Sequence, residues 1–398
     1  MRILIAHEAL AGGGGVESYL HSVIPSLKRR GHEVAVLHFN PEAQQGPTRL
    51  VFPDIPTIGV ADLGLGEAMQ RVRGWQPDVA FVHNMRHLAV DGHLAAQAPV
   101  VKMMHGYFGT CISGQKCHLF PGATPCSRVF GAACLTLYLP RRCGQMRPLR
   151  MLEGFEWAGR QRQLFARYAS LIVASRHMAD EYVRNGVGAD RVTVAPLFPT
   201  IPGCLQPRIR PTEPTVLFAG RMTDLKGPRL LVSAVAEATA RLGRPVQLVL
   251  AGEGPQRESL VRLAETLGVP VSLPGWLTGS ELVALMRRST VVAVPSVWPE
   301  PFGLVGLEAA VHGVPAVGFD IGGIPEWLHD GVNGRLVRET GDARAFGRAL
   351  AEVIGDERLL AALERGALDT AAAMSIDVHL DIVERVLHAA HARRALPT

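Results

Sequence analysis

The sequence predicts an α/β protein of two successive domains, each built on a doubly wound parallel sheet. Short apolar runs alternate with helical patterns along nearly the whole chain, which is the pattern of βαβ units. A Pro-rich segment, residues 198–214, interrupts this alternation near its middle. The length of 398 residues suits two or three domains. Hydrophobic residues make up 47% and charged residues 19%, which favours large buried cores and excludes a disordered chain.

The N-terminal half begins with a strand over residues 2–6, a Gly cluster at 12–15 and a helix that Gly31 ends. Further strands are expected at residues 33–39, 78–83, 100–105, 171–175 and 192–196. Strands separated by helices pair in parallel through right-handed crossovers. We therefore expect a Rossmann-like domain over residues 1–200, with a Cys-containing insert at about 106–150.

Five prolines in residues 198–214 exclude a helix or a central strand, so we expect a linker over 201–214. Strands then follow at residues 215–220, 246–251, 270–273, 291–295 and 314–318. Helices are expected at residues 228–241, 256–267 and 279–288, and from about 303 to 313. A second Rossmann-like domain thus spans 215–375, and a helix over 376–398 can pack back on the first. Facing domains of this kind bind ligands in the cleft at the carboxyl ends of their strands.

No apolar run reaches the length of a membrane span, and the N-terminus lacks a cleavage-type site, so we expect a cytoplasmic protein. Residues 1–200 carry 21 Lys and Arg against 14 Asp and Glu, whereas residues 201–398 carry 20 against 22. This asymmetry indicates either compositional drift or an anionic partner, such as a phosphorylated or lipid-linked acceptor or the inner face of a membrane. The Arg-rich segment 141–168 is either a solvated helix face or such a contact. Nucleic acid is not expected, because exposed aromatic residues are not interleaved with these charges.

Five of the six cysteines lie in this half: Cys111, Cys117, Cys126, Cys134 and Cys143. Their spacings lack the close CxxC pairs of a zinc ribbon, and without a secretion signal disulfides are not expected. Two interpretations remain. The thiols form a structural metal site, with His105 or His118 nearby, or they are reduced thiols packed in a loop-rich insert.

The segment PSVWPEPFGLVGLEAAVHG, residues 295–313, carries the strongest chemical pattern. A strand ends at Pro295, Glu300 lies in the following loop, and Glu308 lies within the expected helix. The first amides of a helix attract an anion. Those amides belong to Phe302, Gly303 and Leu304. Glu300 can then face a ligand at this helix start, and Glu308 can accept two hydroxyl hydrogen bonds, as from a ribose. The alternative is that both are ordinary surface residues, which the apolar surroundings of Glu308 disfavour.

A second pattern, AGRMTDLKG, places Arg221 and Lys226 on the loop between a strand and the next helix. A guanidinium fork and an ammonium five residues apart suit a diphosphate, although a solvated loop pair is the alternative. Lys226 is the only Lys in residues 201–398, in a chain whose other cations there are all Arg.

Together, these motifs resemble the retaining glycosyltransferases of family 4, which have the GT-B fold. The resemblance rests on GRMTDLKG, GEGP (252–255), LPGWL (273–277) and the E-x7-E pair Glu300 and Glu308, followed by GGIPE (322–326) and GVNGRLV (331–337). GGGGVESYL, RGHEV and the HG at 105–106 fit as well. The resemblance implies a nucleotide-diphosphate-sugar donor in the second domain and an acceptor mostly on the first.

The resemblance also implies roles. Arg221 and Lys226 hold the diphosphate, Glu308 binds the ribose, and Glu300 meets the donor sugar and the distal phosphate. His105 lies beside the reacting sugar, where a satisfied structural histidine is the alternative; His7, His83 and His177 are interpreted as structural. The remaining donor-binding residues are Gly13, Gly14, Gly15, Gly220, Gly275, Phe302, Gly303 and Leu304.

No metal or other cofactor is expected, because no DxD pair follows an apolar strand and Arg221 and Lys226 supply positive charge for the leaving group. The residues identify no carboxylate for a double displacement, and the family implies front-face transfer assisted by the leaving phosphate. A dehydrogenase is disfavoured, since the Gly cluster is not a GxGxxG motif followed by an acidic residue.

The sequence therefore predicts a metal-independent, retaining hexosyltransferase that uses a UDP- or GDP-sugar. Its acceptor is a hydroxyl group of a glycan, a glycolipid or a small-molecule glycoside. The alternatives are an epimerase or phosphorylase acting on related substrates, and a catalytically inactive sugar-nucleotide-binding subunit.

Overall fold

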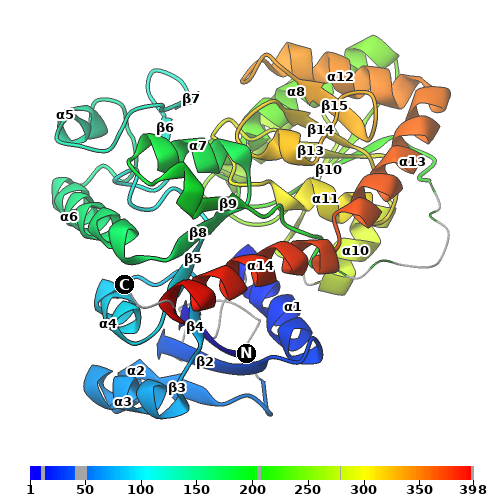
Figure 1. Ribbon diagram of the computed structural model, residues 1–398. Helices are drawn as coiled ribbons and strands as arrows, with labels where there is room; N and C mark the ends of the chain where they lie inside the picture. The colour runs from blue at the N-terminus through cyan, green and yellow to red at the C-terminus, as the bar shows by residue number, and fades with distance from the viewer. Residues whose placement is uncertain are drawn as a thin grey trace.

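The computed structural model describes residues 1–9, 14–40, 52–201, 203, 208, 210–277 and 279–395, and it confirms the predicted fold class. Two parallel-sheet α/β domains face each other, and the last long helix crosses from the second domain back over the first (Figure 1). Two facing domains, each with a parallel sheet, are the arrangement that the resemblance implied.

The N-terminal sheet has seven parallel strands in the order β3-β2-β1-β4-β5-β8-β9. Its strands are β1 (Arg2–Ala9), β2 (Glu33–Asn40), β3 (Thr57–Gly59), β4 (Val79–Val82), β5 (Val100–Met104), β8 (Ser170–Val173) and β9 (Val192–Val194). Its helices are α1 (Gly15–Arg29), α2 (Val60–Leu63), α3 (Leu65–Trp75), α4 (Leu88–Gln97) and α7 (Arg176–Arg184), with 3-10 turns η1 (Phe165–Arg167) and η2 (Ala189–Arg191). The direction of winding reverses beside β1, which pairs with both β2 and β4. Such a reversal opens a crevice at the carboxyl ends of these strands.

The C-terminal sheet has six parallel strands in the order β12-β11-β10-β13-β14-β15. Its strands are β10 (Thr215–Ala219), β11 (Gln247–Ala251), β12 (Val271–Gly275), β13 (Val291–Val294), β14 (Ala316–Phe319) and β15 (Gly334–Val337). Its helices are α8 (Pro228–Leu242), α9 (Arg257–Leu267), α10 (Gly279–Arg287), α11 (Leu304–Ala310), α12 (Ala343–Gly355) and α13 (Glu357–Ala373), with η3 (Asp224–Lys226) and η4 (Ile324–Glu326). Here the winding reverses between β10 and β13, so a second crevice faces the first.

Within the two sheet-forming domains, three short elements were missed in the sequence, namely β3, α2 and β15. Each has three or four residues, too few to show a period. The predicted helix over 303–313 is also wrong in length. Gly303, at a φ of +81°, precedes α11, whose seven residues end at Ala310, and residues 311–313 form a turn.

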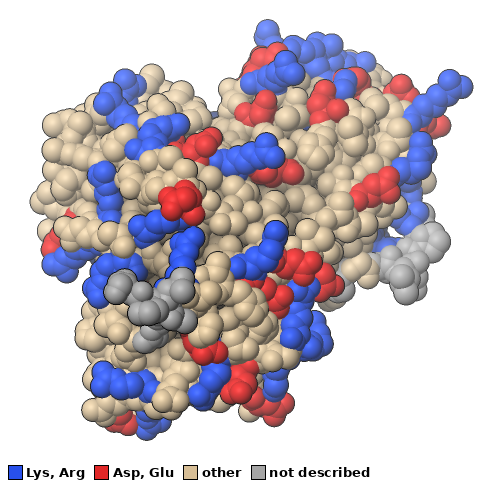
Figure 2. All heavy atoms as spheres, viewed as in Figure 1, with Lys and Arg blue, Asp and Glu red and all other residues tan. Residues whose placement is uncertain are grey.

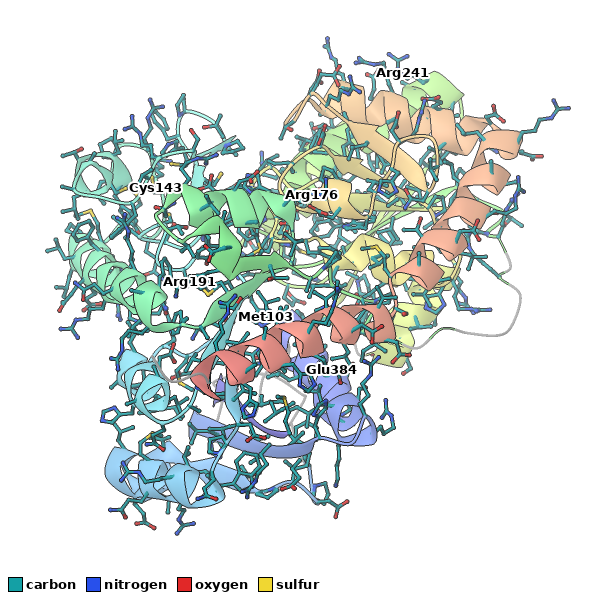
Figure 3. All side chains as sticks on the ribbon, viewed as in Figure 1. Met103, Cys143, Arg176, Arg191, Arg241 and Glu384 are labelled. Carbon is teal, nitrogen blue, oxygen red and sulfur yellow. The ribbon has the colours of Figure 1, made fainter. Side chains whose placement is uncertain are left out.

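Helix α14 (Ile376–Ala395) lies beside α1 on one face of the N-terminal sheet (Figure 1). Its buried side chains Leu380, Val383 and Leu387 join the core formed by α1 and the strands. Arg30, at the end of α1, donates hydrogen bonds to Asp381 at 2.7 Å and Glu384 at 2.9 Å, and Figure 3 shows Glu384 on α14. This contact ties the end of the chain to its beginning.

Two described residues of the expected linker, Arg208 and Arg210, bind the C-terminal domain. Arg208 donates to Glu364 of α13 at 2.6 Å, and Arg210 donates to the same carboxylate at 2.9 Å. The two guanidinium groups share one carboxylate and hold the crossing segment against the domain.

The Cys-containing insert lies between β5 and β8. It comprises the antiparallel pair β6 (Cys117–His118) and β7 (Thr124–Pro125), then α5 (Ala133–Tyr138) and α6 (Pro148–Leu164). A small core of its own forms around Ile112, Phe130, Tyr138 and Ala158.

In the part of the chain that the structure describes, no helix is both long enough and apolar enough to span a bilayer.

Candidate active site

A cleft of about 380 Å³ lies where the two crevices meet. Both domains contribute to its walls. The N-terminal domain and the crossing segment supply Gly15, Val16, Tyr19, His105, Leu197, Phe198 and Thr200. The C-terminal domain supplies Phe218, Ala219, Arg221, Lys226, residues 293–296, Trp298 and residues 300–305. The cleft therefore brings together Gly15, His105, Arg221, Lys226, Glu300, Phe302, Gly303 and Leu304, eight residues singled out from the sequence.

Lys226 and Glu300 form an ion pair at the cleft. The Nζ atom of Lys226 donates to Oε1 of Glu300 at 2.6 Å, and Ser296 Oγ donates to the same oxygen at 2.5 Å. The Glu300 side chain is 4% exposed, whereas that of Lys226 is 25% exposed. A buried carboxylate needs partners of this kind. The ammonium also lies 5.7 Å from the centre of the Trp298 ring.

The loops after β10 and β13 are packed closely enough to fix this pair. Gly227, at a φ of +68°, has no room for a side chain, since a Cβ there would lie 2.1 Å from the carbonyl oxygen of Pro295. Val297 N donates to Leu225 O at 2.9 Å between the same loops. The turn that carries Lys226 is thus set against the loop that carries Glu300.

The GGIPE segment supports the Glu300 loop from its other side. Gly323 N donates to Glu300 O at 2.7 Å, and a Cβ on Gly322 would lie 2.4 Å from that oxygen. Glu326 of the segment accepts a hydrogen bond from Arg176 N, at the start of α7, at 2.6 Å. Figure 3 shows Arg176 facing the C-terminal domain. The segment therefore positions the site and also joins the two domains.

Glu308 lies on α11 behind the cleft wall. It accepts a hydrogen bond at Oε1 from Thr200 Oγ1 at 2.7 Å, and burial raises its pKa, partly offset by that hydrogen bond. Thr200, on the crossing segment, itself lines the cleft. The predicted partners of Glu308 were the hydroxyl groups of a ribose, and that role stays a prediction; the hydroxyl that this carboxylate contacts in the structure belongs to Thr200.

His105 follows β5 and shares a hydrogen bond of 3.0 Å between its Nε2 and Nδ1 of His83. Burial, and next the nearby His7, lowers the pKa of His105 to about 3. Burial likewise holds the pKa of His83 well below its usual value. Both imidazoles are therefore neutral at pH 7. His83 was interpreted as structural, and the structure places it in direct contact with His105.

Tyr19 of α1 packs edge-on against His105, with ring centres 5.5 Å apart, and shares a hydrogen bond of 2.9 Å with Nε2 of His379 on α14. Tyr19 and Ser296 lie within the segments GGGGVESYL and PSVWPEPFGLVGLEAAVHG, but neither they nor Thr200 were given a role from the sequence. Their roles depend on partners that are distant in the sequence.

The glycines of the predicted set differ in position. Gly13 lies outside the described residues, and Gly14 caps α1. Gly220 directly follows β10, and its N–H donates to Ala251 O at 2.9 Å. Gly275 ends β12, at a φ of +84°, and its carbonyl accepts from Gly252 N at 2.7 Å. Gly14, Gly220, Gly275 and Glu308, four other residues of the predicted set, are not among the described residues that line the cleft.

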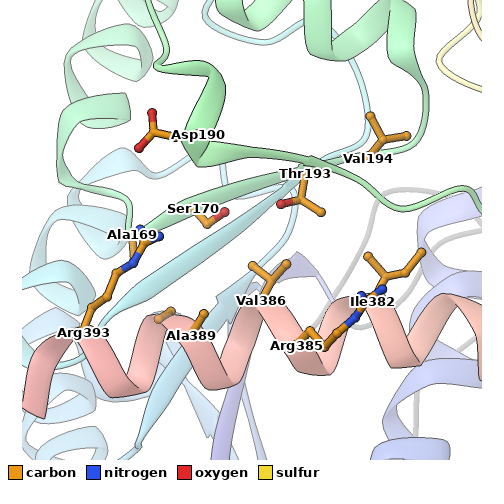
Figure 4. A pocket seen from close by; sticks show the side chains of 11 residues that line it. Ala169, Ser170, Asp190, Thr193, Val194, Ile382, Arg385, Val386, Ala389 and Arg393 are labelled. Atoms are coloured by element: carbon orange, nitrogen blue, oxygen red, sulfur yellow. The ribbon is translucent and has the colours of Figure 1, made fainter.

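Across the residues with described positions, no group of three or more His, Cys, Asp and Glu side chains is placed to hold a single metal ion. A second pocket, of about 330 Å³, lies between α14 and the strands β8 and β9 (Figure 4). Arg393 reaches from α14 toward Ala169 there, and the pocket shares no lining residue with the cleft.

Two family models match the chain. The model described as Glycosyltransferase Family 4 matches residues 13–198, and that described as Glycosyl transferases group 1 matches residues 206–369. Together the two matches take in most of both domains.

Among relatives, a D-inositol 3-phosphate glycosyltransferase of Xylanimonas cellulosilytica is 29% identical over 94% of this chain and 93% of its own length. A protein of the same name from Nocardia farcinica is 33% identical to this chain. That match covers 54% of this chain and 51% of the relative, which is about half of its length.

Solved structures share the fold. A lipopolysaccharide outer core galactosyltransferase superposes with a TM-score of 0.69 at 15% identity, over 98% of this chain and 99% of that one. The Anabaena protein HepE, solved with UDP and glucose, superposes with a TM-score of 0.67 at 18% identity, over 97% and 99%.

Proposed function

The chain belongs to the glycosyltransferases of family 4, and on this premise we propose that it moves a sugar from a nucleotide-diphosphate sugar to a hydroxyl acceptor, with retention of anomeric configuration. The donor is a UDP- or GDP-sugar, and the leaving diphosphate is stabilised without a divalent metal. The acceptor is a hydroxyl of a glycan, a glycolipid or a small glycoside.

The observation that carries this proposal is the placement of two cations, Arg221 and Lys226, in a cleft at the reversal point between β10 and β13. Ligands of open α/β sheets bind at such points. When a glycosyl bond breaks, negative charge develops on the leaving diphosphate, and fixed cations at that place stabilise it. Helix α11 was expected to add a positive helix end, but with seven residues it sums few peptide dipoles. We therefore assign the diphosphate to the two side chains.

The opposite wall suits a sugar that acquires positive charge. Transfer passes through an oxocarbenium-like state, which a protonated imidazole would repel. Burial keeps the pKa of His105 at about 3, so its ring is neutral and can hydrogen-bond without adding charge. Tyr19 and His105 then face the reacting sugar from the N-terminal domain.

The carboxylates that line the site are consistent with front-face transfer, in which no covalent glycosyl-enzyme intermediate forms. Among the described residues that line the cleft, Glu300 is the one carboxylate. It is engaged by both Lys226 and Ser296. A carboxylate held in this way is a weak nucleophile, so we assign it to orientation of the donor rather than to a covalent intermediate.

The insert supports contact with an anionic surface that carries the acceptor. Residues 106–152 contain six Lys and Arg and neither Asp nor Glu. Five of these cations are exposed, whereas Lys116 is buried. Several of its apolar side chains are exposed, among them Phe120, Met146, Leu149 and Leu152. Figure 2 shows blue basic side chains around the lobe that carries α5 and α6. Apolar side chains ringed by cations favour an anionic bilayer surface. Co-sedimentation with vesicles containing anionic lipid, compared with neutral vesicles, tests this part of the proposal.

A thermal-shift panel of UDP-, GDP- and ADP-sugars tests the donor, because a ligand that binds the folded state raises its apparent stability. The stabilising donor, radiolabelled in its sugar, is then incubated with candidate acceptors, and NMR of the product reports the anomeric configuration. Labelled product of unchanged configuration supports the proposal. An isomerised donor without transfer would instead identify an epimerase, and an inverted product would refute retention.

A further inference from the structure

The five cysteines of the insert surround one small cavity. Its volume is about 30 Å³. Its lining includes Cys111, Cys117, Cys126, Cys134, Cys143 and His118, together with Ile112, Arg128, Leu137 and Tyr138. The cysteines come from separate places in the insert, namely the loop after β5, β6, the loop after β7, α5 and the loop before α6. Folding thus gathers five thiols and an imidazole that the sequence spreads over 33 positions.

These thiols are free, and their polar contacts are weak. None of the five is in a disulfide. His118 Nδ1 lies 3.2 Å from Cys143 Sγ, Cys117 Sγ donates to His118 O at 3.3 Å, and Cys111 Sγ lies 3.5 Å from Ser113 Oγ. The contacts of Cys134 and Cys143 with carbonyl oxygens are longer, at 4.0 Å and 3.9 Å. Thiols are weak hydrogen-bonding groups, so these contacts give little reason for so many sulfurs in one place.

The five sulfurs lie around one cavity, inside the lobe that the insert forms. Figure 3 shows Cys143 inside the lobe formed by the insert. A structural core would fill such a cavity with aliphatic side chains, which pack without leaving reactive sulfur.

We propose that the cysteine-lined cavity of the insert holds a thiolate-bound metal centre, a zinc ion or an iron–sulfur cluster. Cysteine sulfur is the ligand that both centres prefer, and four sulfur or nitrogen donors complete either one. As each sulfur–metal bond forms, the S–H bond breaks and its proton passes to solvent. Six side chains are available around the cavity, so two are in excess of the four needed.

The donors as described surround a cavity and do not converge on one point. A zinc ion would require four of them to turn inward until each lies about 2.3 Å from the metal. An iron–sulfur cluster also takes four such ligands and is larger than a single ion, so the lining side chains would have to move outward to admit it. Both centres share thiolate ligation, and metal analysis distinguishes them.

The centre would fix the insert against the proposed active site. Cys117 is buried, and its Sγ also lies 4.0 Å from the carbonyl oxygen of Val297, on the loop that carries Ser296 and Glu300. The adjacent Lys116 forms a buried ion pair of 2.7 Å with Glu181 of α7. Metal binding here would therefore stabilise the edge of the insert that contacts the C-terminal domain.

The test is metal analysis of the full chain, purified without oxygen and without added metal. We expect about one zinc per chain, or several irons with matching acid-labile sulfide and an absorption band in the visible range. X-ray absorption at the metal edge should show sulfur neighbours at about 2.3 Å. This measurement uses the unaltered protein, so it does not depend on how any variant folds.

Variants identify the ligands. Cys126→Ser and Cys143→Ser should each lose most of the metal, whereas Cys204→Ser, which alters the sixth cysteine, should retain it. Metal well below stoichiometry in the unaltered protein, with the five thiols all reactive, would overturn the proposal. So would a metal whose neighbours are nitrogen and oxygen alone, or one lost equally from Cys204→Ser.

Discussion

The ammonium of Lys226 lies 2.6 Å from Oε1 of Glu300, and this pair joins the two loops on either side of the sheet reversal. The carboxylate is nearly fully buried, whereas the ammonium is partly open to the cleft. Glu300 therefore holds the cation in place before a donor binds, and the exposed side of the ammonium remains available to an anion. A preorganised charge of this kind stabilises a leaving diphosphate without a cost of reorganisation.

Replacing Lys226 tests this assignment. For Lys226→Ala we expect kcat/KM to fall roughly 100- to 1000-fold, since removal of one preorganised donor to a developing charge costs about 3–4 kcal/mol. Steady-state kinetics and donor titration measure the change. Arg229→Ala is the matched control, because Arg229 is an exposed cation at the start of α8 and does not line the cleft.

A structural contribution of the pair must be separated from its effect on transfer. Lys226→Ala leaves Glu300 buried with Ser296 as its remaining partner, which destabilises the fold. Adding Glu300→Gln should recover stability but not turnover. If the double variant regained normal kcat/KM, the diphosphate role of Lys226 would be wrong.

Glu308 is predicted to recognise the ribose. A site built to bind hydroxyl groups rejects an analogue that lacks them. The unaltered protein should therefore bind a nucleoside diphosphate about 10- to 100-fold more tightly than its 2′,3′-dideoxy analogue, consistent with about 1.5–3 kcal/mol for hydrogen bonds to a charged group. Glu308→Gln should lose most of this preference, as measured by calorimetry. Thr200→Val removes the hydrogen bond to Glu308 but should retain the preference for the nucleotide that carries both ribose hydroxyls. If the Glu308 and Thr200 variants discriminated equally between the two nucleotides, the ribose role of Glu308 would be wrong.

Turnover should not require a divalent cation, because Arg221 and Lys226 supply the positive charge. We expect brief exposure to EDTA to leave the initial rate unchanged, and added Mg²⁺ or Mn²⁺ to have no effect. Restoration of a lost rate by Mg²⁺ would show that the leaving group needs a metal. A slow loss that Mg²⁺ cannot restore would instead point to the thiolate site in the insert, since Mg²⁺ prefers oxygen ligands.

Acidification should destabilise the protein through its buried histidines. Burial lowers the pKa of His105 to about 3 and that of His379 to about 4, and it holds the pKa of His83 well below its usual value. Below the unfolded pKa of about 6.5 the unfolded chain takes up protons that the folded chain does not, so stability falls as the pH falls. Each such group costs up to about 1.4 kcal/mol per pH unit. Burial raises the pKa of Glu308, so this carboxyl stabilises the folded state as the pH falls. The destabilising effect of the three imidazoles exceeds this contribution.

Chemical denaturation between pH 7.5 and 5 measures this slope. His379→Gln should make it shallower, because the amide can still contact Tyr19 or the carbonyl of Pro196 but does not titrate. His93→Gln is the control, since His93 is exposed on α4. An equally steep slope in the His379 and His93 variants would show that buried imidazoles do not set the acid limit.

The two-domain α/β fold and the family could be predicted from the amino-acid sequence, and Arg221, Lys226 and Glu300 could be singled out as candidates, because apolar periodicity and short motifs are local along the chain. The contacts that these and other residues make could be seen only in the folded protein. Glu308 meets Thr200 across 108 positions, Tyr19 meets His379 across 360, and His83 meets His105 through neighbouring strands. Five cysteines without a recognisable spacing also face one cavity. Such contacts depend on how strands and helices pack, and packing brings together residues whose separation along the chain carries no periodic signal.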